Sequence, residues 1–161
     1  MEKLIKKSLI NALEEQLARN LPLFKLKKDL ALPQGWRCYG AALDGGLNAF
    51  LMLVTKSDEN QFILEIAVSP SAYPPDSLRG GPSDPVEGGL YFRAHKLWQT
   101  GGREPWWCIQ NESKEHTAKS KVLAAAGIAP SLNEKPLSVI MKELETVLKQ
   151  YIAPYFLNIR R

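Results

Sequence analysis

The amino-acid sequence predicts an α+β fold in which an antiparallel β-sheet meander of about five strands carries an N-terminal helix and one or two C-terminal helices. Two observations predict this order. Apolar residues recur at helical spacing near both ends of the chain, and apolar runs typical of β-strands occupy its first half. A chain of 161 residues is long enough for a core of its own and too short for two comfortable domains, so residues 1–161 are expected to form one domain.

The first expected element is an amphipathic helix over residues 2–20. Its apolar side chains recur every fourth position from Ile5 to Leu17, which places them on one face. Pro22 ends the helix, because a proline disfavours the helical conformation in the residue before it. The lysines between the apolar positions are expected to face solvent.

Three apolar runs, at residues 36–43, 47–55 and 61–69, predict the meander. The Asp-Gly-Gly stretch at 44–46 joins the first two as a hairpin, since glycine accepts the positive φ that such turns need. The third run alternates a strongly apolar face with a mixed one. The second run is apolar on both faces and is expected at the centre of the sheet. A partial alternation at 23–29 predicts a short strand ahead of the meander.

The segment 70–89 is rich in proline and glycine and interrupts every periodic pattern. We expect residues 70–89 to form a loop within the single domain. A plain flexible loop is the favoured interpretation and a ligand lid is the alternative. The stretch "RGGPSDPVEGG" lacks the spacing of a phosphate-binding loop, and its prolines remove N–H groups that a phosphate would need.

Two further strands are expected at 90–98 and 106–110, and a helix at 112–127 that stops at a glycine. A second helix is expected from Pro136 to Tyr151, with an apolar coda at 153–159 that must pack against the rest. The expected buried stripe of the second helix comprises Leu137, Ile140, Met141, Leu144, Val147, Leu148 and Tyr151.

The residue types that carry chemistry form no recognisable motif. Cys38 and Cys108 match no disulfide or zinc spacing, so we expect free, buried thiols in a reducing cytoplasm. His95 and His116 are the only histidines, and no metal-binding or nucleophile motif surrounds them. Glu65 lies in mid-strand and is expected to be solvated or salt-bridged. The sequence therefore predicts no catalytic residue, no metal and no cofactor.

The composition of the chain limits the classes of partner that it is expected to bind. No stretch approaches the roughly 18 apolar residues of a membrane span, and the N-terminus is not a secretory signal. The net charge of +4 is concentrated at the two ends of the chain, around a slightly acidic centre. Because the tryptophans and the lysines occupy different segments, nucleic-acid binding is disfavoured.

The stretch "GGREPWWCIQ" (101–110) is the best candidate for a site. In a strand, Trp106 and Trp107 point to opposite faces of the sheet, so one should be core and the other should face outward. The outward tryptophan, with nearby arginines, would line an aromatic and cationic pocket, since tryptophan and arginine are enriched at binding hot spots. The favoured interpretation is that both are bulky core anchors, and the pocket is the alternative. The candidate ligand- or partner-binding residues are Arg93, His95, Trp98, Arg103, Trp106 and Trp107.

The order of the pieces "GWRCYGAAL", "NQFILEIAV", "YFRAHKLW", "REPWWCI" and "VLKQYIAPYF" resembles a bacterial family, the domain of unknown function 4304. The similarity covers most of the chain from residue 23 on and does not include the insert at 70–89. The resemblance implies an α+β fold and no known activity.

These observations favour a non-enzymatic cytoplasmic protein that binds another protein, such as an immunity-type partner of a bacterial toxin. A small-molecule ligand is an open possibility. One alternative is a small enzyme with its site between the 70–89 loop and the Trp/Arg/His cluster, using His95 or His116. Nucleic-acid binding through the basic termini is the other.

Overall fold

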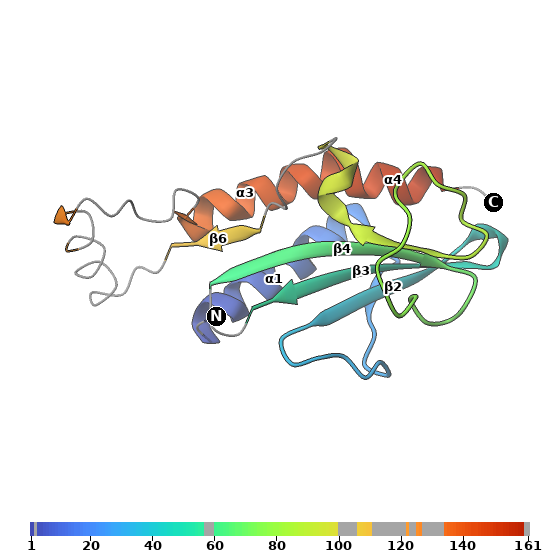
Figure 1. Ribbon diagram of the computed structural model, residues 1–161, viewed down its shortest axis with the longest axis horizontal. Helices are drawn as coiled ribbons and strands as arrows, with labels where there is room; N and C mark the ends of the chain where they lie inside the picture. Colours follow the sequence, from blue (N-terminus) through green and yellow to red (C-terminus); the bar gives the residue numbers. More distant parts are fainter. Residues whose placement is uncertain are drawn as a thin grey trace.

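The computed structural model describes residues 1, 3–56, 60–99, 106–110, 122, 125–126 and 134–159. It is an α+β structure in which helices cover one face of a twisted sheet (Figure 1). The helices are α1 (Lys3–Asn20), α3 (Leu137–Val147) and α4 (Ala153–Asn158), with a π-helical turn at Leu148–Ile152 and 3-10 turns at Asp44–Gly46 and Ala94–Leu97. The strands are β1 (Lys25–Leu26), β2 (Arg37–Leu43), β3 (Leu47–Thr55), β4 (Gln61–Ser69), β5 (Leu90–Arg93), β6 (Trp107–Ile109) and β7 (Glu134–Lys135).

The antiparallel meander β2–β3–β4 is confirmed, with β3 between the other two. Leu43 pairs with Leu47 across the turn Asp44–Gly46, whose two glycines have a φ of 75°. The expectation of an antiparallel sheet of about five strands is roughly right, since every described strand pair except one is antiparallel. Within the part of the chain that the structure describes, the sheet has seven strands and is mixed, because β6 and β7 pair in parallel. The strands β1 and β7 have two residues each, too few to leave a periodic pattern.

The strands β5 and β6 share one edge of β4. Arg93 of β5 lies opposite Glu65, and Trp107 of β6 lies opposite Phe62. Between these pairs the chain leaves the sheet. The strand expected at 90–98 therefore ends at Arg93, and a 3-10 turn follows in which the Trp98 N–H donates to the His95 carbonyl. This turn carries the apolar residues after position 93 out of the edge strand and toward the C-terminal helices.

The two faces of the sheet have separate cores, as the period of two requires. Phe62, Leu64, Ile66 and Val68 of β4 face α1 and the C-terminal helices, in the cluster that also holds Leu9 and Leu13 of α1. The opposite face carries Cys38, Phe50, Met52, Val54, Ile63, Ala67 and Tyr91, with Leu30, Leu32, Trp36 and Trp106 packed against it. The apolar and mixed faces expected for β4 are thus both largely buried.

The C-terminal helix does not end at Tyr151 as the sequence suggests. It continues through the π-helical turn into α4, so the expected coda is helical (Figure 1). Pro154 has no N–H and would clash with a carbonyl in a regular α-helix. The preceding Ala153 N–H donates five residues back, to the Leu148 carbonyl. A wider turn of this kind lets the helix pass the proline without breaking.

The wider turn also changes which side chains are buried. Tyr151, expected in the buried stripe, is 38% exposed, whereas Ile152 is fully buried. Ile140, Leu144, Val147 and Leu148 are buried as expected, and Leu137 and Met141 are partly buried.

The Pro/Gly-rich segment 70–89 is hydrogen-bonded to the sheet at β3 and at β5. Asn48 Nδ2 of β3 donates to the Ser71 carbonyl at 3.0 Å. Arg79 exchanges two backbone hydrogen bonds with Tyr91, at 2.7 and 2.9 Å. The helix expected at 112–127 lies almost entirely outside the described residues. Among the helices that the structure describes, none is long and apolar enough to cross a membrane.

Gly35→Ala should destabilise the fold by about 2 kcal/mol, because it combines a strained backbone with a clash. Gly35 has a φ of 93°, and an added Cβ would lie 2.7 Å from Thr55 Oγ1. That hydroxyl donates to the Gly35 carbonyl at 2.8 Å. Gly46→Ala is the matched control, since its φ of 75° is also positive but no atom lies within 4 Å of the added carbon. Urea denaturation should show that the control loses about 1 kcal/mol of its free energy of unfolding. Equal losses for Gly35→Ala and Gly46→Ala would show that the contact with Thr55 adds no destabilisation.

Candidate functional site

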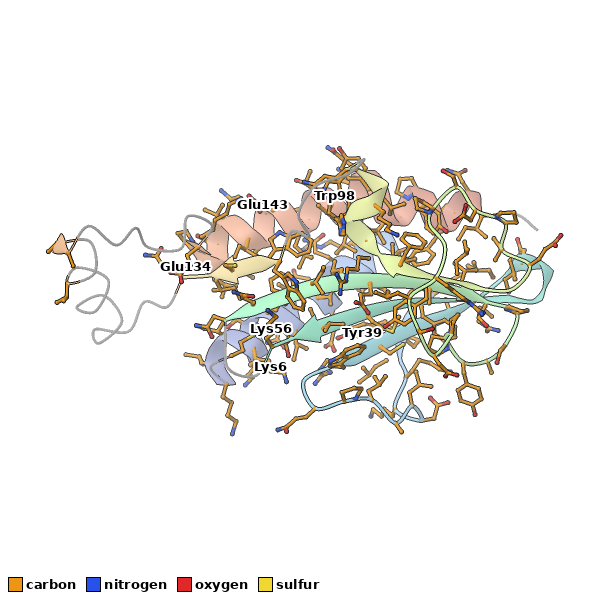
Figure 2. The ribbon with its side chains drawn as sticks, in the orientation of Figure 1. Lys6, Tyr39, Lys56, Trp98, Glu134 and Glu143 are labelled. Atoms are coloured by element: carbon orange, nitrogen blue, oxygen red, sulfur yellow. The ribbon has the colours of Figure 1, made fainter. Side chains whose placement is uncertain are left out.

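An open groove between β6 and α3 brings together three of the predicted site residues, Trp98, Trp106 and Trp107. We call it the tryptophan groove. Its volume is about 1120 Å³. The α3 wall consists of Val139, Ile140, Lys142, Glu143, Thr146 and Val147. Figure 2 shows Glu143 and Trp98 along the outer side of the C-terminal helices.

Trp107 and Trp98 are the two indoles of the groove that contact each other. Trp107 stacks on Phe62 of β4, with ring centroids 5.0 Å apart and an interplanar angle of 11°. Trp98 reaches Trp107 at 6.3 Å and Tyr151 at 5.6 Å. Both tryptophans are half-buried and pack against the helix-covered core. They are therefore anchored by the core on one side and line the groove on the other.

Trp106 faces the opposite side of the sheet from Trp107, as strand alternation predicts. It packs against the second core and carries the Lys56 ammonium 4.6 Å from its ring centroid. A cation over an indole face is a favourable contact, worth about 0.5–1 kcal/mol at an exposed site. The expected division into one core and one outward tryptophan is not so sharp, because both side chains are half-buried.

Among the described lining residues of the groove, the charged side chains are two lysines and one glutamate. Lys135 of β7 forms an ion pair with Glu143 of α3 that links the two walls. Both partners are well exposed, so the pair adds little stability. Lys142 is exposed and has no ion pair with a described residue. The described lining thus carries a net positive charge.

Arg93 lies outside the groove, in a buried polar cluster on the second face. Its Nε is 3.6 Å from Glu65 Oε1, and the Tyr91 hydroxyl donates to Glu65 Oε2. Glu65 is only 4% exposed, so it is salt-bridged rather than solvated. Burial and the hydrogen bond to Glu65 raise the pKa of the Tyr91 hydroxyl, which stays protonated and remains a donor. Arg93 and Tyr91 thus give the Glu65 carboxylate an ion pair and a hydrogen bond inside the sheet's second core.

His95 lies in the 3-10 turn after β5 and is half-buried. Its Nδ1 is buried and has no hydrogen-bond partner among the described residues. Burial lowers the pKa of His95, and the positive charges of Arg93 and Lys96 lower it further. The ring is therefore neutral at neutral pH. Arg103 and His116, which the sequence also singles out, lie outside the described residues.

The two cysteines differ more than the sequence suggests. Cys38 is fully buried, and that burial raises the pKa of its thiol to about 12. Cys108 was also expected to be buried, but it is half-buried and lines the groove. Cys108 lies opposite Gln61, the first residue of β4, on one side and opposite Glu134 of β7 on the other. Cys38 and Cys108 do not form a disulfide, and the Cys108 thiol lies 3.6 Å from the Trp106 carbonyl.

Sequence reasoning missed the α3 wall of the groove. Val139, Lys142 and Thr146 lie on the side of α3 away from its buried stripe, where the pattern indicates only a solvated surface. The exposed valine, 41% accessible on that polar side, is the one signal that could have drawn attention to it. A smaller hollow of about 450 Å³ lies farther along the same helical rod, between Val86 and Tyr155.

No protein-family model matches the chain, and neither a curated protein nor a solved structure matches it. The resemblance to the domain of unknown function 4304 family therefore stays a prediction. The candidate site rests on the geometry of this chain alone.

Proposed function

We propose that this chain is a non-enzymatic, cytoplasmic binding protein whose tryptophan groove receives part of a partner protein, as an immunity-type protein would. The observation that carries the proposal is the meeting of Trp98 and Trp107 with the outer side of α3 in an open groove. Tryptophan contributes a large contact area at low entropic cost and dominates many interfaces.

The apolar surface in the groove supports a binding role. Val139 is 41% exposed although it lies beside two half-buried tryptophans. A partner that covered these side chains would remove apolar area from water, which is the main favourable term in most protein association. The rims carry lysine, glutamate and threonine, and a polar rim around an apolar centre is typical of non-obligate interfaces.

Capture from the native host tests the proposal with two matched variants. Val139→Gln replaces the exposed apolar side chain of the groove with a neutral polar one that suits a helix. Leu157→Gln makes the same kind of change on α4, where Leu157 is 76% exposed and lines neither hollow. The tagged wild-type chain should retain a stoichiometric partner, Val139→Gln should lose most of it, and Leu157→Gln should retain it.

Two outcomes would overturn the proposal. The first is repeated capture without a stoichiometric partner. The second is a partner that Val139→Gln and Leu157→Gln retain equally, because that partner would bind elsewhere. Circular dichroism of both variants should match the wild type, since both positions are exposed.

A further inference from the structure

We infer that the tryptophan groove recognises an acidic peptide segment that carries a bulky apolar side chain. This inference rests on the proposed function and deepens it by naming the chemistry of the partner. It follows from three properties of the groove, which are its size, its apolar floor and the sign of its charges.

The size of the groove indicates an extended segment rather than a single small molecule. Pockets for drug-sized ligands have volumes of about 300–1,000 Å³ and bury most of the ligand. The tryptophan groove is larger, at about 1120 Å³. It is also open, since it lies between a strand edge and one side of a helix. A peptide of several residues fits such a site better than a compact ligand.

The floor of the groove selects an apolar side chain. Ile140 and Val147 are buried at its base, and the indoles of Trp98 and Trp107 form the adjoining wall. Trp107 is held against Phe62, and Trp98 is held between Trp107 and Tyr151. A wall fixed in this way loses little entropy when a leucine or an aromatic residue packs on it.

The positive charges of the groove favour a peptide with acidic residues next to its bulky apolar side chain. Lys142 stands exposed on the α3 wall, without an ion pair to a described residue. Lys135 stands on the β7 side and is paired with Glu143, the one carboxylate among the described lining residues. Because that ion pair is solvent-exposed and weak, a carboxylate of the partner can compete for Lys135 at small cost.

Lys56 extends the positive charge to the far side of Trp106, since its ammonium lies over that ring. Lysines thus lie near the indoles at three places, directly after β3, on β7 and on α3. An acidic segment approaching this surface is attracted, whereas a basic segment is repelled. The charge pattern also disfavours a nucleic acid as occupant, because these few lysines form no continuous basic face.

Selection from a library of displayed random 12-residue peptides tests the inference with the full chain as bait. Enriched peptides should carry a net negative charge and at least one leucine or aromatic residue. Val139→Gln should abolish the enrichment and Leu157→Gln should not. Enriched peptides of this composition would show that the groove binds a specific class of peptide rather than peptides in general.

Charge-reversal variants then test the electrostatic part on the best synthetic peptide. Lys142→Glu should weaken its binding about tenfold, an effect expected for a charge at the edge of an interface. Lys149→Glu is the matched control, since Lys149 is exposed on the same helical rod and lines neither hollow. The control should change the affinity less than about twofold. Peptide binding should also slow modification of Cys108 by a soluble thiol reagent, while buried Cys38 stays unreactive.

Enriched peptides that are basic or neutral would overturn the inference, and so would a failure of the library to enrich any peptide. Equal effects of Lys142→Glu and Lys149→Glu would also overturn it. The proposed function fails differently. If the captured partner is lost with Val139→Gln but the selected peptides are not acidic, the groove is a binding site of another specificity.

Discussion

Glu65→Ala should lower the free energy of unfolding by about 3 kcal/mol, the low end of the cost of removing one member of a buried ion pair. The glutamate is 4% exposed in the middle of β4, and Arg93 and Tyr91 both contact it. Without the carboxylate, the Arg93 guanidinium would lose its ion pair with Glu65 in the sheet's second core. The Tyr91 hydroxyl would lose its acceptor.

Two further variants separate charge from volume. Glu65→Met keeps much of the side-chain volume and removes the charge, so it should cost nearly as much as Glu65→Ala. Tyr91→Phe removes one hydrogen bond to the carboxylate and should cost about 1–2 kcal/mol. Urea denaturation with a common m-value would measure all three. A loss below about 1 kcal/mol for both Glu65 variants would contradict the prediction, because it would mean that the Arg93 guanidinium is not left as an uncompensated buried charge.

The meander illustrates what a sequence can predict well. Alternation in β4 and the continuous apolar run of β3 are local patterns that report directly which faces are buried. The hairpin at Asp44–Gly46 was predictable because positive φ needs glycine there. These features depend on residues close together in the chain, so no knowledge of the tertiary structure is needed.

The errors arose where distant residues decide the structure. The run after Arg93 includes apolar Leu97 and Trp98, but Trp98 contacts Tyr151 of the C-terminal helices instead of extending the strand. The π-helical turn ahead of Pro154 shifts the helical phase, which exposes Tyr151. The pairing of β7 with β6 joins segments that no local pattern relates. The partner of Glu65 could not be chosen from the sequence, since strand register determines that Arg93 lies opposite it.

The candidate site was predictable only in its aromatic half. Trp98, Trp106 and Trp107 stand out by residue type, and alternation correctly separates the last two. Lys142 and Val139 do not stand out, because an exposed lysine or valine on a helix is ordinary in any protein. They become interesting only when α3 lies beside β6 and turns those side chains toward the indoles.

Trp107→Ala should cost about 3 kcal/mol of stability, and Trp106→Ala about 1 kcal/mol, as their packing implies. The Trp107 ring stacks on fully buried Phe62 and supports Trp98, so its removal opens a cavity under the helix-covered face. Trp106 packs on the edge of the second core and contacts the exposed Lys56.

The same pair of variants distinguishes an anchor from a binding residue. At a temperature where both variants are folded, Trp106→Ala should retain the partner more weakly than its small stability loss explains, because Trp106 lines the groove without holding the main core. Urea denaturation and partner capture on the same preparations would measure the two effects. Equal stability losses of about 3 kcal/mol, with no separate loss of binding, would make both tryptophans anchors of the sheet edge.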